Sequence, residues 1–183
     1  NKQIQRCCEY EKYKNITQEL KALEEKRKDP YYTLIAIILS LRTTLENETR
    51  AVQNFMNRYK SIEDVLNSNE SELAEVIKIA GMPQKKANTI IKLSQYIQQY
   101  YNGDIWNAKT DSVQETRERL LNMPGVGEKS ADCMLELGFD MPSMVVDINV
   151  FRTASRIFGE KWANNPDFSN KKQIKSIKDR LEN

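Results

Sequence analysis

Two glycines and a lysine fall between two stretches of helical periodicity, in the segment Met123-Pro124-Gly125-Val126-Gly127-Glu128-Lys129. Glycine adopts backbone torsions that other residues avoid and lets an anion approach the main chain. The helix expected after Gly127 offers free amides and the positive end of its dipole to a phosphate. Such a hairpin can hold a nucleic-acid backbone without reading bases, although a Pro-Gly-x-Gly turn is also an ordinary helix connector. Gly125, Val126 and Gly127 are therefore a candidate phosphate-binding site.

Any catalysis in this chain has to proceed without histidine, because none of its 183 residues is one. This excludes histidine metal ligands and every imidazole base. A lysine must lose its proton to act as a nucleophile, and free lysine has a pKa of about 10.4. Lys129, in the first turn of an expected helix, has its ammonium form disfavoured by the helix dipole and by partial burial. Taken singly, Lys129 could be a solvated lysine and Asp147 a plain helix cap.

Two longer motifs contain this pair: Pro-Gly-Val-Gly-Glu-Lys-Ser-Ala-Asp-Cys at residues 124–133 and Val-Val-Asp-Ile-Asn-Val-Phe-Arg at residues 145–152. Together they resemble the signature of the helix-hairpin-helix base-excision DNA glycosylases, and the endonuclease III branch in particular. The resemblance spans roughly residues 29–159. It implies that Lys129 is the nucleophile and that Asp147, eighteen positions later, assists it.

The resemblance implies a base-excision-repair DNA glycosylase with abasic-site (AP) lyase activity. Lys129 would attack the anomeric carbon of the sugar, giving a Schiff base that permits β-elimination and strand cleavage. Asp147 would stabilise the positive sugar and handle the proton of the lysine. The default substrate is an oxidised pyrimidine, and the expected partner is double-stranded DNA with a damaged base or an abasic site. We expect an intracellular, DNA-associated monomer.

Three other interpretations stay open. A related glycosylase could act on 8-oxoguanine or on a mismatched or methylated pyrimidine. A non-catalytic helix-hairpin-helix module could bind the DNA backbone within a larger assembly, but binding alone does not require both Lys129 and Asp147. A purely structural domain comes third.

Because the target base is stacked in a duplex, it must be flipped out, and a side chain must fill the gap. The resemblance points to Arg42, in the motif at residues 39–44, and to Met82, in the motif Ile-Ala-Gly-Met at residues 79–82. Methionine is a suitable apolar wedge. Met82 could instead fill the core, and Arg42 could be a cation that complements a helix end.

Lysines could add phosphate contacts. Lys85, Lys86 and Lys92 lie in a stretch without acidic residues, from residue 84 to residue 101. They could contact phosphate or form a solvated face. The basic segment that begins at Lys171 carries the same ambiguity.

The hairpin has one further role by resemblance. In family complexes its main-chain carbonyls hold a monovalent cation against the phosphate, which implies the carbonyls of Leu121, Met123 and Val126 here. We expect no other metal or cofactor.

Cysteine usage departs from the endonuclease III branch, which usually carries a four-cysteine iron–sulfur site near its carboxyl end. This chain has three cysteines, Cys7, Cys8 and Cys133, and none follows Asp147. The cluster cannot form as the family builds it, so the chain represents a cluster-free branch or a fragment. Cys133 lies on an expected core-facing helix, so we expect it to be a small, buried apolar side chain.

Three other positions also depart from the family pattern. Asn149 stands where many members have histidine, and Arg42 replaces the usual glutamine. Both changes concern recognition of the base. Glu128 adds a negative charge to the hairpin, which predicts weaker and more salt-sensitive DNA binding.

These residues must be positioned by helices, because apolar residues recur at three- and four-residue spacing and no stretch alternates. The pattern predicts an all-α fold, and the resemblance implies a two-lobed glycosylase fold with a helix-hairpin-helix motif. Expected helices cover residues 1–27, 31–41, 61–66, 83–101, 128–137 and 147–157, others start near Thr43 or Thr44, Asn69 or Ser71, and Ser112, and a last segment covers 169–181. Gly81 and Gly138 are the expected helix stops.

We expect two lobes with the active cleft between them. A helical barrel lobe would span residues 30–138 and contain the helix-hairpin-helix at about 112–138. The second lobe would combine residues 1–29 with residues 139–183 and carry Asp147.

Composition narrows the class further. The net charge is +2, which does not by itself point to nucleic acid. An odd number of cysteines argues against a secreted disulfide framework. The longest apolar run, Leu34–Leu39, is far below the roughly 20 residues that cross a bilayer, and the charged amino terminus does not resemble a signal peptide. We expect no membrane association.

Overall fold

The computed structural model describes residues 29–164 and 167–181, and in these ranges the chain forms helices and no strand. This confirms the predicted all-helical fold. The elements are α2 (Pro30–Ser40), α3 (Leu45–Arg58), α4 (Ile62–Leu66), α5 (Glu70–Ile77), η1 (Lys78–Ala80), α6 (Pro83–Tyr101), η2 (Ile105–Ala108), α7 (Val113–Leu121), α8 (Glu128–Phe139), α9 (Ile148–Ile157) and α10 (Lys171–Leu181). The helix expected over residues 1–27 lies outside the described residues.

Most helices begin where capping residues predict. The side chains of Asp29, Thr44 and Ser112 each accept a hydrogen bond from a backbone amide in the first turn of α2, α3 and α7. Each such cap satisfies an amide that has no partner inside its helix, and contributes about 1 kcal/mol. Pro83 opens α6, where its missing N–H costs nothing.

One predicted helix end is wrong: α8 does not stop at Gly138 but continues to Phe139. Gly138 lies inside the helix and is buried. A Cβ there would come within 2.5 Å of Met134 Cε, so glycine serves close packing at this position. The left-handed residue that ends α8 is Asp140, with a φ of 52°.

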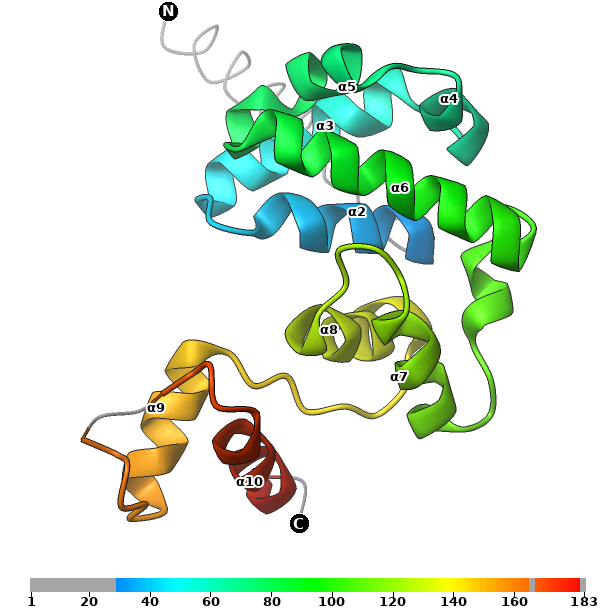
Figure 1. The fold of residues 1–183 in the computed structure, drawn as a ribbon. Coiled ribbons are helices and arrows are strands. Elements are labelled where there is room, and N and C mark those ends of the chain that lie inside the picture. The colour runs from blue at the N-terminus through cyan, green and yellow to red at the C-terminus, as the bar shows by residue number, and fades with distance from the viewer. Residues whose placement is uncertain (1–28, 165–166, 182–183) are drawn as a thin grey trace, which may run out of the picture.

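Helix α2 is the centre of the larger lobe, because nearly its whole surface is apolar. Leu34, Ile35, Ile38 and Leu39 are at most 2% exposed. Figure 1 shows α2 between α6 and α8, and α3 also packs against it. A helix that is apolar on all sides is stable only when other elements surround it. The same scaffold therefore holds α8 and the loop that follows α2.

A smaller group of buried side chains holds α9 and α10 together: Val146, Phe151, Ala154 and Ile177. The last residue of the larger core is Met141. Residues 140–147 have no regular structure and form the linker that runs from α8 to α9 in Figure 1. We call the α9–α10 unit the smaller lobe. The predicted domain limits, including the contribution of residues 1–29, stay predictions.

Candidate active site and nucleic-acid interface

A tight turn and one apolar anchor fix the hairpin between α7 and α8. The Val126 amide donates to the Met123 carbonyl across 3.1 Å, and the Val126 side chain is only 8% exposed. Gly125 has a φ of 81°, a region that residues with a side chain rarely adopt. A Cβ on Gly125 would lie 2.2 Å from Thr89 Cγ2 on α6. Glycine is therefore required at position 125 both by torsion and by contact.

Gly127 faces open space instead. Its φ is −101° and its ψ −179°, which any residue adopts, and a Cβ would meet nothing within 4 Å. No side chain caps the first turn of α8 that follows. The exposed main chain at Gly127 and the first amides of α8 are thus open to an anion.

The two glycines are expected to respond differently to alanine. Gly125→Ala should lower the free energy of unfolding by at least about 2 kcal/mol, because left-handed backbone costs an L-residue 1–2 kcal/mol and Thr89 must also move. The Thr89 hydroxyl, bonded to the Lys85 carbonyl at 2.9 Å, resists that movement. Gly127→Ala should cost less than about 1 kcal/mol, since alanine is only a poorer N-cap. Urea titration measures both, and equal losses would contradict this account.

Arg42 and Met82, the two candidates for filling the gap left by the flipped base, are both exposed. Both have a left-handed backbone conformation, with φ values of 54° and 51°. Met82 is 38% exposed, so the core-filling interpretation of Met82 is wrong. It precedes α6, whose first turn no side chain caps. Strained torsions in residues with side chains concentrate at sites that contact ligands.

Lys129 lies in the first turn of α8 with an exposed side chain, so the partial burial expected from the sequence is not found. Within the described residues, Lys129 makes no hydrogen bond or ion pair. Two cavities adjoin it, one of about 420 Å³ and one of about 630 Å³, and Lys129 lines both. Its amine is therefore free to meet a bound molecule.

The smaller cavity lies between the end of α2, the start of α3 and one face of α8. Besides Lys129, its walls are Thr33, Ala36, Ile37, Ser40, Leu41, Glu48, Ser130, Cys133 and Leu137. The Cys133 side chain is half-buried on this wall, one turn after Lys129.

Both predicted catalytic residues influence the Cys133 thiol. Burial raises its pKa most, the Lys129 charge lowers it, and Asp132, Glu136 and Asp147 raise it further. Lys129 of the larger lobe and Asp147 of the smaller lobe thus both contribute to the electrostatic environment of this thiol.

Asp147 is also the N-cap of α9. Its Oδ1 accepts hydrogen bonds from the amides of Asn149 at 2.9 Å and Val150 at 2.8 Å. Both bonds end on Oδ1, and no hydrogen bond within the described residues uses Oδ2. Capping thus fixes the carboxylate and leaves one oxygen for another partner.

Lys86 corrects a prediction, because it is neither a phosphate contact nor part of a solvated face. It is 3% exposed, and its Nζ donates to the carbonyls of Leu39 at 2.8 Å and Ala80 at 2.7 Å. Burial lowers its pKa, and Glu48 opposes that change. Leu39 precedes the Arg42 loop and Ala80 precedes the Met82 loop. Lys86 therefore joins the bases of both loops, while its neighbour Lys85 is exposed.

Replacing Lys86 by methionine should lower the free energy of unfolding by about 2 kcal/mol, because two buried carbonyls lose their shared donor. Lys85→Met is the matched control, and its exposed side chain predicts a change within about 0.5 kcal/mol. Guanidinium unfolding of both variants checks the difference. An unchanged Lys86→Met protein would show that the two carbonyls find other partners.

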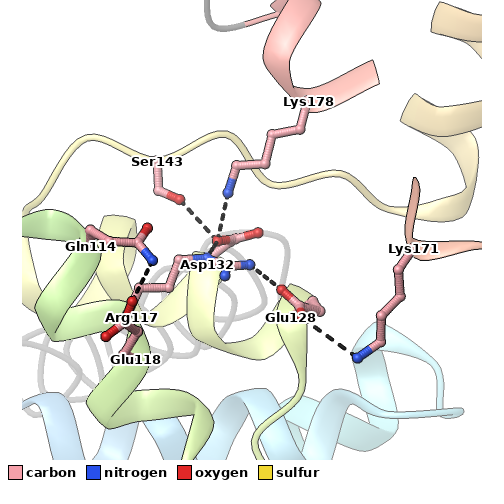
Figure 2. Close-up of polar contacts among 8 residues, drawn as sticks. All are labelled: Gln114, Arg117, Glu118, Glu128, Asp132, Ser143, Lys171 and Lys178. Carbon is pink, nitrogen blue, oxygen red and sulfur yellow. Dashed lines mark hydrogen bonds and ion pairs between the residues drawn. The ribbon is translucent and has the colours of Figure 1, made fainter. Parts of the chain in front are cut away.

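Sequence reasoning missed a buried ionic cluster around Asp132, which Figure 2 shows together with nearby polar contacts. Asp132 Oδ1 accepts from Arg117 Nε at 2.8 Å and Lys178 Nζ at 2.7 Å. Arg117 also bonds Glu128. Burial alone would lower the pKa of Arg117, but these two carboxylates together raise it. The only local signal was an acidic residue on the core-facing side of a predicted helix.

The same cluster changes the interpretation of Glu128 and of the basic segment. The Glu128 carboxylate pairs with Arg117 and, at 3.9 Å, with Lys171. Its negative charge in the hairpin is thus partly balanced. Lys178, which is only 16% exposed and bonds Asp132, is therefore not part of a solvated basic face, whereas the Lys171 side chain is 84% exposed.

Comparison with known proteins gives one family. Residues 35–178 match the model described as HhH-GPD superfamily base excision DNA repair protein. The chain is 33% identical to Endonuclease III of Thermotoga maritima over 132 residues, which are 72% of this chain and 58% of that protein. It is 31% identical to Thymine/uracil-DNA glycosylase of Methanothermobacter thermautotrophicus over 137 residues, 75% of this chain and 58% of that protein. The chain thus spans 58% of the length of both relatives.

A solved structure agrees with these relatives. The structure of a thermostable thymine-DNA glycosylase superposes with a TM-score of 0.70 and 28% sequence identity, covering 83% of this chain and 66% of the other. Over residues 29–164 and 167–181, no helix of this chain is long and apolar enough to cross a membrane.

Proposed function

The chain belongs to the HhH-GPD superfamily of base excision DNA repair proteins, and on this premise we propose that it is a DNA glycosylase with abasic-site lyase activity. The observation that carries the proposal is the position of Lys129. Its exposed amine lies on the wall shared by two cavities, and Asp147 of the smaller lobe acts on the same neighbouring thiol. A module that only binds DNA needs neither group.

The proposed reaction begins when Lys129 Nζ, without its proton, attacks C1′ of the flipped nucleotide. The Nζ–C1′ bond forms, the bond from C1′ to the base breaks, and the base leaves with its electron pair. Asp147 stabilises the positive sugar and accepts the proton that the amine releases. Asp147 passes this proton to O4′ as the C1′–O4′ bond breaks, which gives a Schiff base between Nζ and C1′. The C2′ proton is then lost to water, a C2′–C3′ double bond forms, the C3′–O bond breaks with its electron pair going to the phosphate, and the strand is cut.

The DNA interface that we propose has two parts. The exposed main chain at Gly125 and Gly127, with Val126 as the buried anchor, holds a phosphate at the start of α8. Arg42 and Met82 enter the duplex where the base has left, and Lys85 contacts the backbone. Gly127→Ala should therefore weaken binding of duplex DNA about tenfold, measured by fluorescence anisotropy, although it barely changes stability. We propose that the protein acts as a monomer on DNA inside the cell.

We also propose that the carbonyls of Leu121, Met123 and Val126 hold a monovalent cation when a phosphate is bound. The Met123 carbonyl accepts one hydrogen bond and so keeps a lone pair for a cation. The cation would balance the charge of the phosphate. A four-cysteine iron–sulfur site does not fit this sequence, which has three cysteines.

The experiment that tests the proposal is borohydride trapping with a duplex that holds one abasic site, because it tests the amine without knowing the preferred base. We expect a covalent complex whose modified peptide contains Lys129. Binding without an adduct would favour a non-catalytic module or a glycosylase whose aspartate activates water. If the protein neither binds the duplex nor forms an adduct, the proposal is rejected for this chain.

The base is proposed separately. An oxidised pyrimidine follows from the endonuclease III resemblance, whereas the similarity to thymine/uracil-DNA and thymine-DNA glycosylases favours a mismatched pyrimidine. A panel of duplexes that each carry one lesion, including 8-oxoguanine, separates these substrates. The base released fastest under single-turnover conditions identifies the substrate.

A further inference from the structure

We propose that Asp132 is a positioning residue that ties the smaller lobe to α8 and so sets Asp147 relative to Lys129. The inference rests on the proposed function for its catalytic consequence. Its structural part, the tie itself, can be measured independently of any activity.

Asp132 connects three parts of the chain through one oxygen. It lies three residues after Lys129 on α8 and is 4% exposed. Oδ1 accepts from Arg117 on α7, from Lys178 on α10, and at 3.3 Å from the Ser143 hydroxyl in the linker. Figure 2 shows these donors converging on Asp132.

Two of these contacts lead directly to Asp147. Ser143 stands four residues before Asp147 on the linker. Lys178 follows Ile177, which is fully buried in the small core that α10 shares with α9, and Asp147 caps α9. A movement of α10 or of the linker away from α8 would therefore carry the Asp147 carboxylate away from Lys129.

Apolar packing does little to hold the lobes at this place. The cavity of about 630 Å³ lies between them, with Leu135 of α8 on one side and Ile174 of α10 on another. The second ionic contact, from Lys171 to Glu128, spans 3.9 Å and has its lysine side chain 84% exposed, so it contributes little. The pair between Lys178 and Asp132 has side chains only 16% and 5% exposed. Screening by solvent and salt is much weaker there.

A buried ion pair suits this role because it fixes geometry. Each charge loses its hydration on burial, and only correctly placed partners offset the free energy that this costs. Arg117, held by Asp132 and Glu128, keeps the carboxylate aimed at α10. The ion pair therefore holds α10 in one position against α8, whereas an apolar contact would allow the two helices to slide past each other.

The test measures two variants, Asp132→Asn and Lys178→Met, each with a control that removes the same charge from an exposed place on the same helix. The controls are Glu136→Gln on α8 and Lys172→Met on α10. Hydrogen exchange of residues 171–181 reports docking of α10. Single-turnover borohydride trapping reports chemistry, and anisotropy reports duplex affinity.

In both variants, we expect the amides of α10 to exchange at least about tenfold faster than in the wild type. The rate of borohydride trapping should fall about 10- to 100-fold, while the affinity for duplex DNA stays nearly unchanged. Lys178→Arg, which keeps the charge, should restore trapping, and the double variant should lose no more than either single one. A merely structural role would not separate rate from affinity in this way.

The outcomes are decisive in each case. Unchanged exchange of α10 in both variants would overturn the tie, whatever the activity. Faster exchange with a wild-type trapping rate would overturn the positioning role. If the wild type does not trap at all, the proposed function fails, and the exchange measurement still decides whether Asp132 holds the lobes together.

Discussion

Lys129→Gln is expected to abolish covalent trapping and strand cleavage, with a loss of at least about a thousandfold. Glutamine cannot form a Schiff base, and among the described residues no other lysine lines both cavities. Folding should be unaffected, because Lys129 is exposed and makes no hydrogen bond or ion pair within the described residues. Much of the DNA binding should remain, since the hairpin main chain is intact. Borohydride trapping and gel analysis of a cut abasic duplex measure the effect.

The matched control for this prediction is Lys161→Gln. Lys161 is an exposed lysine outside both cavities, so its removal lowers the net charge equally. Its variant should trap at the wild-type rate. Normal cleavage by purified Lys129→Gln protein would remove Lys129 from the mechanism.

Asp147 carries the second large effect, and its capping role allows a sharper design. Asn and Ser are good N-caps, so Asp147→Asn and Asp147→Ser should keep α9 in place while removing the negative charge. Both should lower the trapping rate about 100- to 1000-fold with little change in duplex affinity. Asp147→Ala should show the same rate loss and in addition lose about 1 kcal/mol of stability.

Comparison of these three variants distinguishes a catalytic role of the Asp147 carboxylate from its role as the N-cap of α9. Single-turnover trapping gives the rate, and thermal melting gives the stability. If Asp147→Ser traps at the wild-type rate, the carboxylate serves only as a cap. A loss of rate and affinity confined to Asp147→Ala, the variant without a cap, would also point to the cap.

Features governed by neighbouring residues were predictable. The limits of α6 follow from Pro83 at its start and from Asn102 and Gly103 after its end, and the structure places the helix at those residues. Thr44 and Asp147 cap the helices that they were expected to cap. A cap or a proline acts within one turn, so the sequence contains the whole of its effect.

The position of Gly138 shows where local reasoning ends. Glycine usually stops a helix, but the contact with Met134 inside α8 uses the missing side chain for packing. The sequence alone does not indicate whether a glycine ends a helix or allows close packing inside one. Helix α8 is held against α2 by tertiary contacts, which override the weak preference of one residue.

By itself, the sequence determined the all-helical fold and the hairpin, because spacing and residue type along the chain carry that information, and its resemblance to the glycosylases indicated Lys129 and Asp147 as the residues to test. Only the tertiary structure decided the roles of Lys86 and Asp132. Lys86 bonds a carbonyl 47 residues away, and Asp132 bonds a lysine 46 residues away. Burial and the choice of partner depend on how distant segments pack. For this reason the sequence could not show that Lys86, predicted as a phosphate contact or part of a solvated face, is buried, or that Asp132 bonds residues of α7 and α10.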